Sequence, residues 1–438
     1  MLEAIQQLAL QYAPYVEQTK LIVHNVTLSL YNVFLLPMIF FSVLFYILAF
    51  SGIFLKPEKK KVTKNYDWPM VTVQIPTFNE PVALRCVKKC LEFDYPKNKL
   101  EILIGDDSNN PSVSNMLNNF AKKHSKLVKV IRRTVNAGFK AGNLNNLLRY
   151  SKGKIVVIFD SDFVPSKNFL KKTMPPFLED ENVGCVQVKW KYMNMSQNRV
   201  SKLASAALMV YHHILAVINS KNGVSLLFGS GQAVRKDLLL KLGGWQEGSL
   251  TEDVEFSLKL LKNGYKTVYL SNFRVLGEVP FTIKGFFKQQ KRWAYGNAKA
   301  FLQYAKWILF GKNLSPLQKS ILTFTLTGYI SAPFLVLFTL FGIISFMTGT
   351  PAQIDFYKFF KETGWMFLVN SGFMAATIIA LIKEKRIRMI YSVIGSSVTV
   401  GFVISMGITA GLFDAITGKK MNWHMIQKRG NEKLNWLK

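Results

Sequence analysis

Four long stretches of the 438-residue chain contain no Lys, Arg, Asp or Glu, and between the first two of them short apolar runs alternate with polar, helix-like segments. The uncharged stretches are 21–55, 320–354, 363–382 and 389–413. Because a helix needs about 20 apolar residues to cross the core of a bilayer, each stretch is long enough to span. The pattern therefore predicts a multi-pass integral protein of the plasma or cell membrane.

The distribution of lysines predicts how the first span is oriented. We expect a transmembrane helix at 31–55, preceded by an extracytosolic or interfacial segment, 1–30, and followed at once by the lysine-rich sequence 56–64. Positive charge marks the cytoplasmic side of a membrane span. The region from 56 to 319 is therefore expected in the cytosol, with the N-terminus outside.

The later uncharged stretches leave the topology open. We expect transmembrane helices at 318–347 and 363–382, whereas 389–413 contains several glycines and is either transmembrane or re-entrant. Three full spans after the cytosolic region put the basic tail, 414–438, outside, but its positive charge favours the cytosol. The sequence is thus compatible with three or four spans.

The region 66–282 has the pattern of an α/β domain. Its β-branched runs are each followed by a polar turn and a helical stretch, and the runs predicted as strands are 71–75, 101–105, 128–131, 155–159, 183–188 and 267–270. Runs this apolar on both faces suit a central sheet that is covered by helices. In such sheets, ligands bind beyond the carboxyl ends of the strands.

Polar and acidic side chains that could bind a ligand or a metal ion follow three of these strands. Pro76 to Pro81 contains Asn79 and Glu80, the second strand ends at Asp106-Asp107, and the fourth ends at Asp160-Ser161-Asp162. Carboxylates gathered at one edge repel one another unless a cation is present. The spacing of Asp160 and Asp162 suits a shared hard ion such as Mg²⁺ or Mn²⁺, although such pairs also cap ordinary turns.

Two glycine-containing turns offer further candidate contacts. The sequence 136–145 places Lys140 between two glycines, where it either reaches a phosphate or simply begins a helix as a solvated lysine. Phe228-Gly229-Ser230-Gly231 precedes a predicted helical run and could present backbone N–H groups or the serine hydroxyl to a ligand.

The triplet Thr251-Glu252-Asp253 opens an amphipathic helix predicted from about 254 to 261. Thr251 could be an N-cap, with the two acids near the positive end of the helix dipole. A carboxylate at a helix start beside a pocket is equally well placed to act as a general base. Both interpretations remain open from the residues alone.

The segment 283–312 alternates basic and aromatic side chains at helical spacing and contains Gln289, Arg292 and Trp293. This pattern is typical of amphipathic helices that lie in the headgroup region of a membrane. The formal net charge of the chain is +30. No recognition-helix, RNA-binding or zinc-finger pattern accompanies the charge, so we expect it to face anionic lipid and phosphate-bearing substrates rather than nucleic acid.

Taken in order, these motifs resemble those of the processive family 2 glycosyltransferases of the cellulose synthase and β-mannan synthase group. The resemblance covers about residues 66–310. It implies an α/β GT-A nucleotide-sugar domain, with a mixed, mostly parallel sheet flanked by helices, fused to transmembrane α-helices. A gating segment of that family has only a weak counterpart at 423–428, which lacks the family's threonine.

The resemblance also implies roles for individual residues. The residues expected to bind the nucleotide sugar are Thr77, Asn79, Glu80, Asp106, Asp107, Lys140, Asn143, Gln289, Arg292 and Trp293. Those expected on the acceptor side are Phe228, Gly229, Ser230 and Trp293. Asp160 and Asp162 would hold Mg²⁺ or Mn²⁺, and the catalytic triplet would be Thr251, Glu252 and Asp253, with Asp253 as the general base.

The activity implied by the resemblance is metal-dependent, inverting transfer of a sugar from a UDP- or GDP-linked donor to a growing β-linked polysaccharide, coupled to translocation. Two alternatives remain: transfer of a single sugar to a membrane lipid, and a silent nucleotide-sugar-binding scaffold. The expected partners are the donor, a glycan or lipid acceptor and the bilayer. Since three or four spans make a narrow channel, secretion could also require a homo-oligomer.

Overall fold

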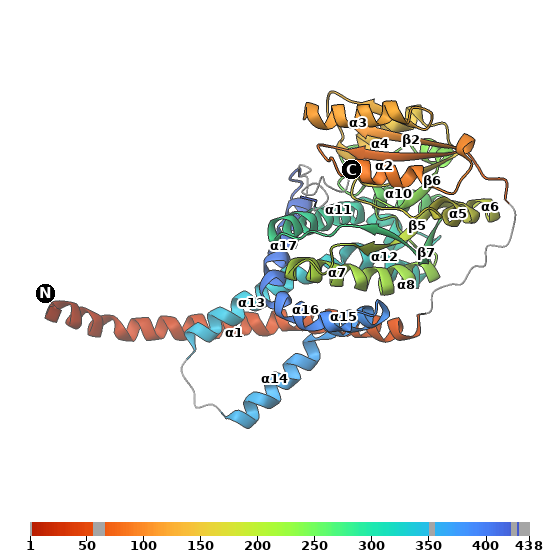
Figure 1. Cartoon of the computed structure of the whole chain (residues 1–438). Coiled ribbons are helices and arrows are strands. Elements are labelled where there is room, and N and C mark those ends of the chain that lie inside the picture. The colour runs from red at the N-terminus through yellow and green to blue at the C-terminus, as the bar shows by residue number, and fades with distance from the viewer. Residues whose placement is uncertain (1, 56–65, 350–354, 422–426, 429–438) are drawn as a thin grey trace.

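The computed structural model describes residues 2–55, 66–349, 355–421 and 427–428. A seven-stranded sheet lies beside a group of long apolar helices (Figure 1). The strands are β1 (Val71–Thr77), β2 (Leu100–Asp106), β3 (Val128–Arg132), β4 (Ile155–Ile158), β5 (Val183–Tyr192), β6 (Gln232–Arg235) and β7 (Lys266–Gly277). Their order is β3-β2-β1-β4-β6-β5-β7, and only β6 runs antiparallel to its neighbours. The predicted mixed, mostly parallel sheet is confirmed.

Strand β6 is the element of the sheet that the sequence analysis missed. A helical run was expected directly after Gly231, but a strand comes first and helix α9 (Lys236–Lys241) begins after it. Gly229 and Gly231 have φ angles of +85° and +61°, which side chains other than glycine rarely adopt. This backbone turns the short segment into the sheet, where Ala233 and Val234 are fully buried.

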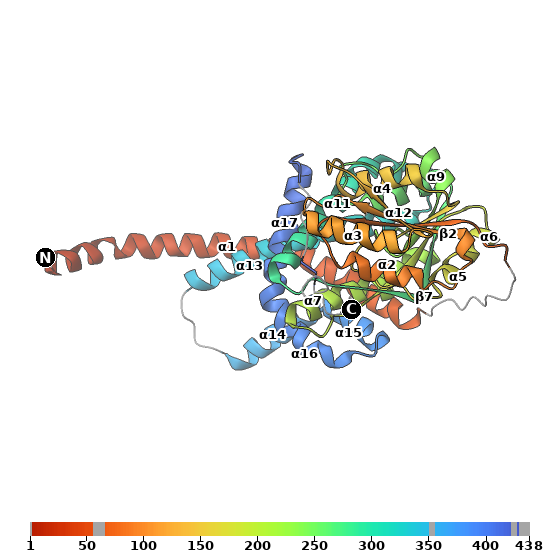
Figure 2. The same ribbon diagram turned by 45° about the horizontal axis from the view of Figure 1, so that its top comes forward.

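Helices cover both faces of the sheet (Figure 2). Alternate residues of β1, such as Val73 and Ile75, pack with α2 (Ala83–Leu91), α3 (Pro111–Lys123), α5 (Phe169–Thr173) and α6 (Pro175–Glu179). On the other face, Val156 and Ile158 of β4 pack with α4 (Phe139–Tyr150), α9 and α10 (Glu252–Lys262). Apolar residues on both faces of the central strands explain why the strands read as continuous hydrophobic runs.

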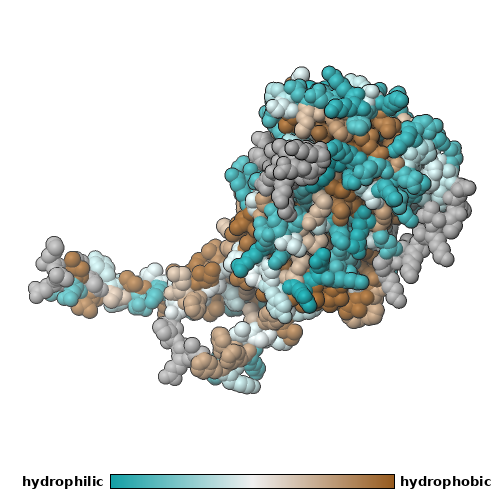
Figure 3. Space-filling model, viewed as in Figure 1, coloured by the Kyte–Doolittle hydropathy of each residue, from teal (hydrophilic) through white to brown (hydrophobic). Residues whose placement is uncertain are grey.

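The apolar helices lie beside the sheet and expose a mostly hydrophobic surface along α1 and α14 (Figure 3). They are α1 (Leu2–Phe54), α12 (Pro316–Thr327), α13 (Ser331–Thr348), α14 (Phe356–Asn370), α15 (Gly372–Lys383), α16 (Ile390–Ser396) and α17 (Phe402–Ile416). By length and composition, the described residues contain 4 helices that could cross a membrane, or up to 5 if the bent pair α14 and α15 forms one span.

One of these 4 candidates is covered by protein. Residues 199–221 comprise α7 (Arg199–Val210), a π-helical segment (Tyr211–Leu215) and α8 (Ala216–Lys221). This stretch is 61% buried within the protein, whereas Pro316–Thr348 is only 11% buried. Packing against β5, α15 and α16 therefore accounts for the hydropathy of 199–221.

Several helix bounds differ from the expected ones. The boundary at residue 31 falls inside α1, and the stretch 318–347 is divided between α12 and α13 by a short turn at Gly328–Ile330. The stretch 363–382 contains a bend of 60° between α14 and α15. At that bend, the Gly372 N–H donates to Ser42 Oγ at 2.8 Å and the Tyr46 hydroxyl donates to the Leu368 carbonyl at 2.8 Å. Side chains of α1 thus satisfy backbone groups that the bend leaves unpaired.

The amphipathic segment expected at 283–312 is a single helix, α11 (Ile283–Phe310), and it packs closely on α17. A Cβ at Gly407 would lie 2.8 Å from the Phe287 ring, and one at Gly411 would collide with the Lys291 carbonyl. The Lys291 ammonium also lies 2.7 Å from Asp414. Helix α11 therefore packs closely on an apolar helix, with the Phe287 ring against Gly407 and the Lys291 backbone against Gly411.

Candidate active site

A cavity of about 680 Å³ lies at the carboxyl ends of β1 and β4 and continues between α1, α7, α11 and α17. Most of the expected site residues line it. These are Thr77, Glu80, Asp107, Lys140, Asn143, Asp160, Asp162, Phe228, Gly229, Thr251, Glu252, Asp253, Gln289, Arg292 and Trp293. Residues that are far apart in the sequence thus meet in one space, as the strand-end argument predicts.

Asp107 is held rigidly by an arginine that the sequence analysis did not identify. The Arg133 guanidinium donates from Nε and Nη2 to the two Asp107 oxygens, at 2.7 and 2.6 Å. It also donates to the carbonyls of Ala137 and Phe139 in the turn before α4. A two-point pair of this kind fixes both position and orientation. Arg133 therefore couples the carboxylate after β2 to the Lys140 turn.

Lys140 lies among three acidic or carbonyl groups at the centre of the cavity. Its ammonium is 2.8 Å from Asp160 and 3.3 Å from Glu252, and it donates to the Gly229 carbonyl at 2.7 Å. Burial lowers the pKa of Lys140, but the Asp160 and Glu252 carboxylates outweigh that effect and raise it above its ordinary value. The side chain is therefore a permanent cation that could move to an incoming phosphate.

Asp162 is deeply buried and accepts from two sides. The Glu278 N–H donates to its Oδ2 at 3.0 Å, and Lys428 donates to its Oδ1 at 2.8 Å. Between the two aspartates, the Ser161 hydroxyl donates to Glu80. Burial lowers the pKa of Lys428, and the Asp162 and Glu80 carboxylates more than reverse this, so its net shift is upward. The acidic edge thus attracts a cation from the C-terminal tail.

The donor set at this edge fits a hard divalent ion. Among the described residues, no three His, Cys, Asp or Glu side chains form a group that could hold a metal by themselves. Asp160 and Asp162 supply two carboxylates, and Mg²⁺ or Mn²⁺ bound in this way usually completes its shell with water and substrate phosphates. Both aspartates are paired with lysines, which shows that positive charge is favoured there.

Asp253 lies beside Gly229 at the start of α10. A Cβ at Gly229 would be 3.3 Å from Asp253 Oδ2 and 3.2 Å from Lys140 Nζ, so the carboxylate and the ammonium flank the same turn. Burial, and then the Glu252 carboxylate, raise the pKa of Asp253 to about 7, although Lys140 opposes the shift. A carboxylate with this pKa is suited to accept a proton near neutral pH.

Several polar atoms in the cavity wall are buried without a hydrogen-bond partner among the described residues. They are Thr77 Oγ1, Asn143 Oδ1, Thr251 Oγ1, Gln289 Oε1 and Arg292 Nε. A buried polar group without a partner costs about 1–3 kcal/mol. Their concentration in one cavity indicates that a polar ligand supplies the partners. Thr251 precedes α10 but its side chain makes no capping hydrogen bond, so simple N-capping does not explain it.

Three expected contact residues do not line the cavity. Asn79 has a φ of +54°, and its side chain bonds to Asn109 and Asn110 within the turn. Asp106 is fully buried and accepts from the Ser108 N–H. Ser230, expected on the acceptor side, is also fully buried, and its hydroxyl accepts from the Asp160 N–H at 2.9 Å. In this structure, Asp106 and Ser230 therefore position strand-end residues that reach the cavity.

Gly229→Ala is expected to reduce catalytic turnover about tenfold more than Gly243→Ala. Both glycines have a φ of +85°, so the backbone strain is matched, but a Cβ at Gly243 meets nothing within 4 Å. Only the first substitution crowds Lys140 and Asp253. Turnover and melting temperature of the two variants provide the comparison, and equal turnover in both would contradict an arrangement centred on Gly229.

Comparison with known proteins agrees with this geometry. The model of the family described as glycosyltransferase like family 2 matches residues 69–296, more than half of the chain. The chain therefore belongs to this family, as the motifs indicated. Its sheet domain has the GT-A fold, confirming that expectation.

Two of the relatives with curated names are plant enzymes. A probable glucomannan 4-beta-mannosyltransferase 7 of Oryza sativa subsp. japonica is 32% identical over 64% of this chain and 49% of its own length. The glucomannan 4-beta-mannosyltransferase 7 of Arabidopsis thaliana is 26% identical over 89% of this chain and 73% of its own length. The chain thus spans about half of the first relative and almost three quarters of the second.

A solved structure supports the fold. The mannosyltransferase PcManGT from Pyrobaculum calidifontis, in complex with GDP-Man and Mn²⁺, superposes with a TM-score of 0.64. The alignment has 19% sequence identity and covers 91% of this chain and 99% of the other. At this identity, the similarity establishes the architecture alone.

Proposed function

We propose that the protein is a membrane-integrated, inverting hexosyltransferase that elongates a β-linked glycan from a nucleoside-diphosphate sugar. The observation that carries this proposal is the single cavity that joins the aspartate pair and Lys140 to Asp253 and then continues toward the apolar helices. Sugar transfer requires the donor and the acceptor to bind next to each other in one cavity. The names of the relatives make GDP-mannose the first donor to test.

The proposed reaction is a single displacement at the anomeric carbon. Asp253 takes the proton from the acceptor hydroxyl as its oxygen attacks, and the bond to the nucleoside diphosphate breaks on the opposite side, which inverts the configuration. Lys140 and Arg292 bind the leaving diphosphate and stabilise its growing negative charge. Asp160 and Asp162 would hold a divalent ion, which would supply further electrostatic stabilisation of the leaving diphosphate.

The remaining cavity residues orient the substrates in this proposal. Asp107, fixed by Arg133, accepts hydrogen bonds from the nucleotide base, and Thr77 and Asn143 contact the nucleotide. Trp293 offers a flat face for the acceptor sugar, and Gln289 lies one helical turn before it on α11. Unpartnered polar atoms on Thr251 and Gln289 support their contact with a sugar.

We infer that the product leaves toward the membrane. The cavity wall includes Phe41, Ser42 and Phe45 of α1 and Ser405 of α17, which belong to helices long and apolar enough to span. Together with the lysines after α1, this supports a cytosolic sheet domain and passage of the growing glycan between the helices. The same opening could admit a lipid acceptor, so product size distinguishes the two activities.

The decisive experiment uses the full chain in nanodiscs with Mn²⁺ or Mg²⁺ and GDP-mannose, UDP-glucose or UDP-N-acetylglucosamine in turn. Nucleoside diphosphate release and product length are measured. We expect a β-linked oligosaccharide of many units from one donor. One sugar on an extracted lipid would instead establish glycolipid synthesis, and nucleotide binding without turnover of any donor would favour a silent scaffold.

Activity is expected to rise with pH and to level off above about 7. Asp253 acts as a base only when deprotonated, and its pKa is raised to about 7. Below that value, kcat/KM should fall about tenfold per pH unit, and above it the carboxylate is fully available. A pH profile measured from 5 to 9 at saturating metal provides the check. A flat profile through this range would exclude Asp253 as the rate-determining base.

A further inference from the structure

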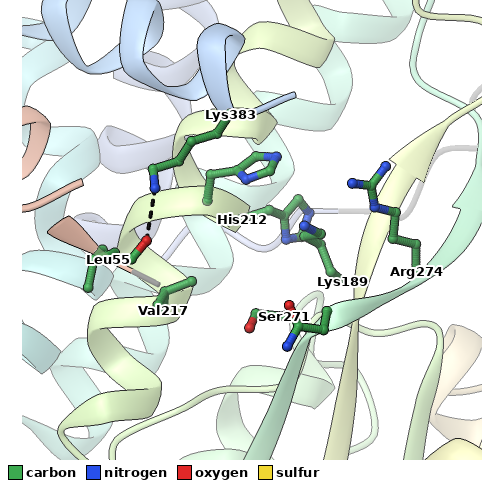
Figure 4. Close-up of a pocket in the computed structure, with 9 residues that line it drawn as sticks. Leu55, Lys189, His212, Val217, Ser271, Arg274 and Lys383 are labelled. Carbon is green, nitrogen blue, oxygen red and sulfur yellow. Dashed lines mark hydrogen bonds between the residues drawn. The ribbon is translucent and has the colours of Figure 1, made fainter. Parts of the chain in front are cut away.

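A second, smaller cavity of about 250 Å³ lies next to the candidate active site, with His212 in the walls of both, on the side of the sheet domain that meets the apolar helices. We call it the basic cavity. Its lining residues are Leu55, Lys189, His212, His213, Val217, Ser271, Asn272, Arg274 and Lys383. Figure 4 shows Lys189 and Arg274 on neighbouring strands, with Lys383 approaching from a helix. No aspartate or glutamate is among these residues.

Lys189 is the residue of the basic cavity with the most unusual environment. Its side chain is only 6% exposed, yet it has no hydrogen bond or ion pair with any residue in the described ranges. Burial, and then the positive charge of Arg274, lower its pKa to about 8. Glu384 opposes this shift only in part. A largely buried lysine without a hydrogen bond or direct ion pair is unfavourable, so its retention beside a cavity indicates a partner that enters the cavity.

The charges around Lys189 give the basic cavity an excess of positive charge. Lys191 and Lys383 also act on Lys189 as like charges, and the nearest acid, Glu384, is already engaged. Glu384 lies 2.9 Å from His213, 3.3 Å from Arg274 and 3.7 Å from Lys191. One carboxylate cannot balance the cluster. An anion in the basic cavity would relieve the repulsion among several cations at once.

The position of the basic cavity indicates where that anion comes from. Leu55 follows the last residue of α1, and Lys383 is the last residue of α15, both of which are candidate spanning helices. The Lys383 ammonium donates to the Leu55 carbonyl at 2.9 Å and so joins the two helix ends. Ser271 and Asn272 add polar side chains from β7. Apolar helices on one side and cations on the other match the two parts of a phospholipid.

We propose that the basic cavity binds the phosphate of an anionic phospholipid from the leaflet next to the sheet domain. Lys189 and Arg274 bind the phosphate oxygens, and Ser271 donates its hydroxyl to the headgroup. The acyl chains lie against the ends of α1 and α15. The basic cavity shares only His212 with the sugar-transfer cavity among the described lining residues, and its test measures melting rather than sugar transfer, so the test does not require the proposed function to be correct.

The test compares the full-length protein in nanodiscs of dioleoylphosphatidylglycerol and of dioleoylphosphatidylcholine. Melting is followed by tryptophan fluorescence. We expect the anionic lipid to raise the melting temperature of the wild type by about 3 °C or more, because it binds the folded state selectively. Lys189→Met should lose this gain. Phosphatidylcholine has no net charge, because its choline ammonium offsets its phosphate. In this lipid, Lys189→Met should therefore melt above the wild type, since a buried positive charge that lacks a direct ion pair has been removed.

Three controls make the result specific. Lys189→Arg keeps the charge and should keep the gain, and Lys129→Met removes an exposed lysine of β3 and should keep it as well. Inorganic phosphate added to phosphatidylcholine nanodiscs should not reproduce the gain. Equal gains in the wild type and Lys189→Met, a lower melting temperature of Lys189→Met in phosphatidylcholine, or full protection by free phosphate would each overturn the proposal.

Discussion

Asp253→Asn is expected to reduce glycosyl transfer by about 10³-fold while leaving nucleotide binding nearly unchanged. The asparagine keeps the size of the side chain but cannot take the acceptor proton, and general-base catalysis usually contributes about 10²–10⁴-fold. Asp253 forms no ion pair with any basic residue in the described part of the chain, so the substitution leaves the Lys140 contacts with Asp160 and Glu252 intact. Turnover and the binding affinity for the free nucleoside diphosphate should be measured together.

The matched control is Glu255→Gln, which neutralises another buried carboxylate on the same helix. Glu255 accepts from the Ser249 hydroxyl at 2.7 Å, and a glutamine oxygen can still do so. We expect it to retain turnover within a few-fold. If Asp253→Asn keeps more than a tenth of the wild-type rate, the base lies elsewhere.

Asp160→Asn is expected to weaken Mn²⁺ binding and Mn²⁺-dependent turnover by about 100-fold or more. A carboxylate ligand to a divalent ion is worth several kcal/mol, and about 1.4 kcal/mol corresponds to a factor of ten. Asp160 also loses its ion pair with Lys140, but Glu252 and the Gly229 carbonyl still hold that ammonium. Electron paramagnetic resonance of Mn²⁺, with and without nucleotide, measures the affinity directly.

Asp237→Asn provides the comparison for this variant because Asp237 is an exposed acid at the start of α9, paired only with Arg235 among the described basic residues. It should leave Mn²⁺ binding unchanged. Addition of a chelator to the wild type should abolish turnover reversibly. Full activity of Asp160→Asn at the wild-type Mn²⁺ requirement would rule out the aspartate pair as the metal site.

Much of the sheet domain was predictable from sequence because its central strands are buried on both faces. Val71–Thr77 and Ile155–Ile158 are buried throughout, and β-branched residues make up much of both, so the sequence pattern identifies them as strands. Strand β6 has only four residues and depends on two left-handed glycines for its entry. This segment forms a strand because it pairs with β4 and β5, and a local sequence pattern does not report such long-range pairing.

The cavity residues were predictable where a motif places a side chain directly after a strand. Asp160 and Asp162 are of this kind, whereas Lys140 lies in the first turn of α4 and was singled out by the glycines around it. The pattern could not tell a residue that faces the cavity from one that supports it, because the sequence does not report side-chain direction in a turn. Ser230 therefore looked like a contact residue. Arg133 was missed because its partner, Asp107, is 26 positions away in the chain.

The membrane helices show a similar limit. Composition marks apolar stretches, but the bend between α14 and α15 depends on Ser42 and Tyr46 of α1, hundreds of positions away. Hydropathy alone also cannot separate the protein-covered stretch 199–221 from helices whose sides face outward. The segment 423–426 of the expected gate lies outside the described residues, which include Gln427 and Lys428 from that region.

The close contact between α11 and α17 has a mechanical consequence. Because the Phe287 ring packs directly on Gly407, the Lys291 backbone lies against Gly411, and Lys291 is paired with Asp414, we expect the two helices to move together. Helices adapt to thicker or thinner bilayers by changing their tilt. We therefore expect a change in the tilt of α17 to displace Gln289 and Arg292 on α11, so that bilayer thickness alters the geometry of the candidate active site.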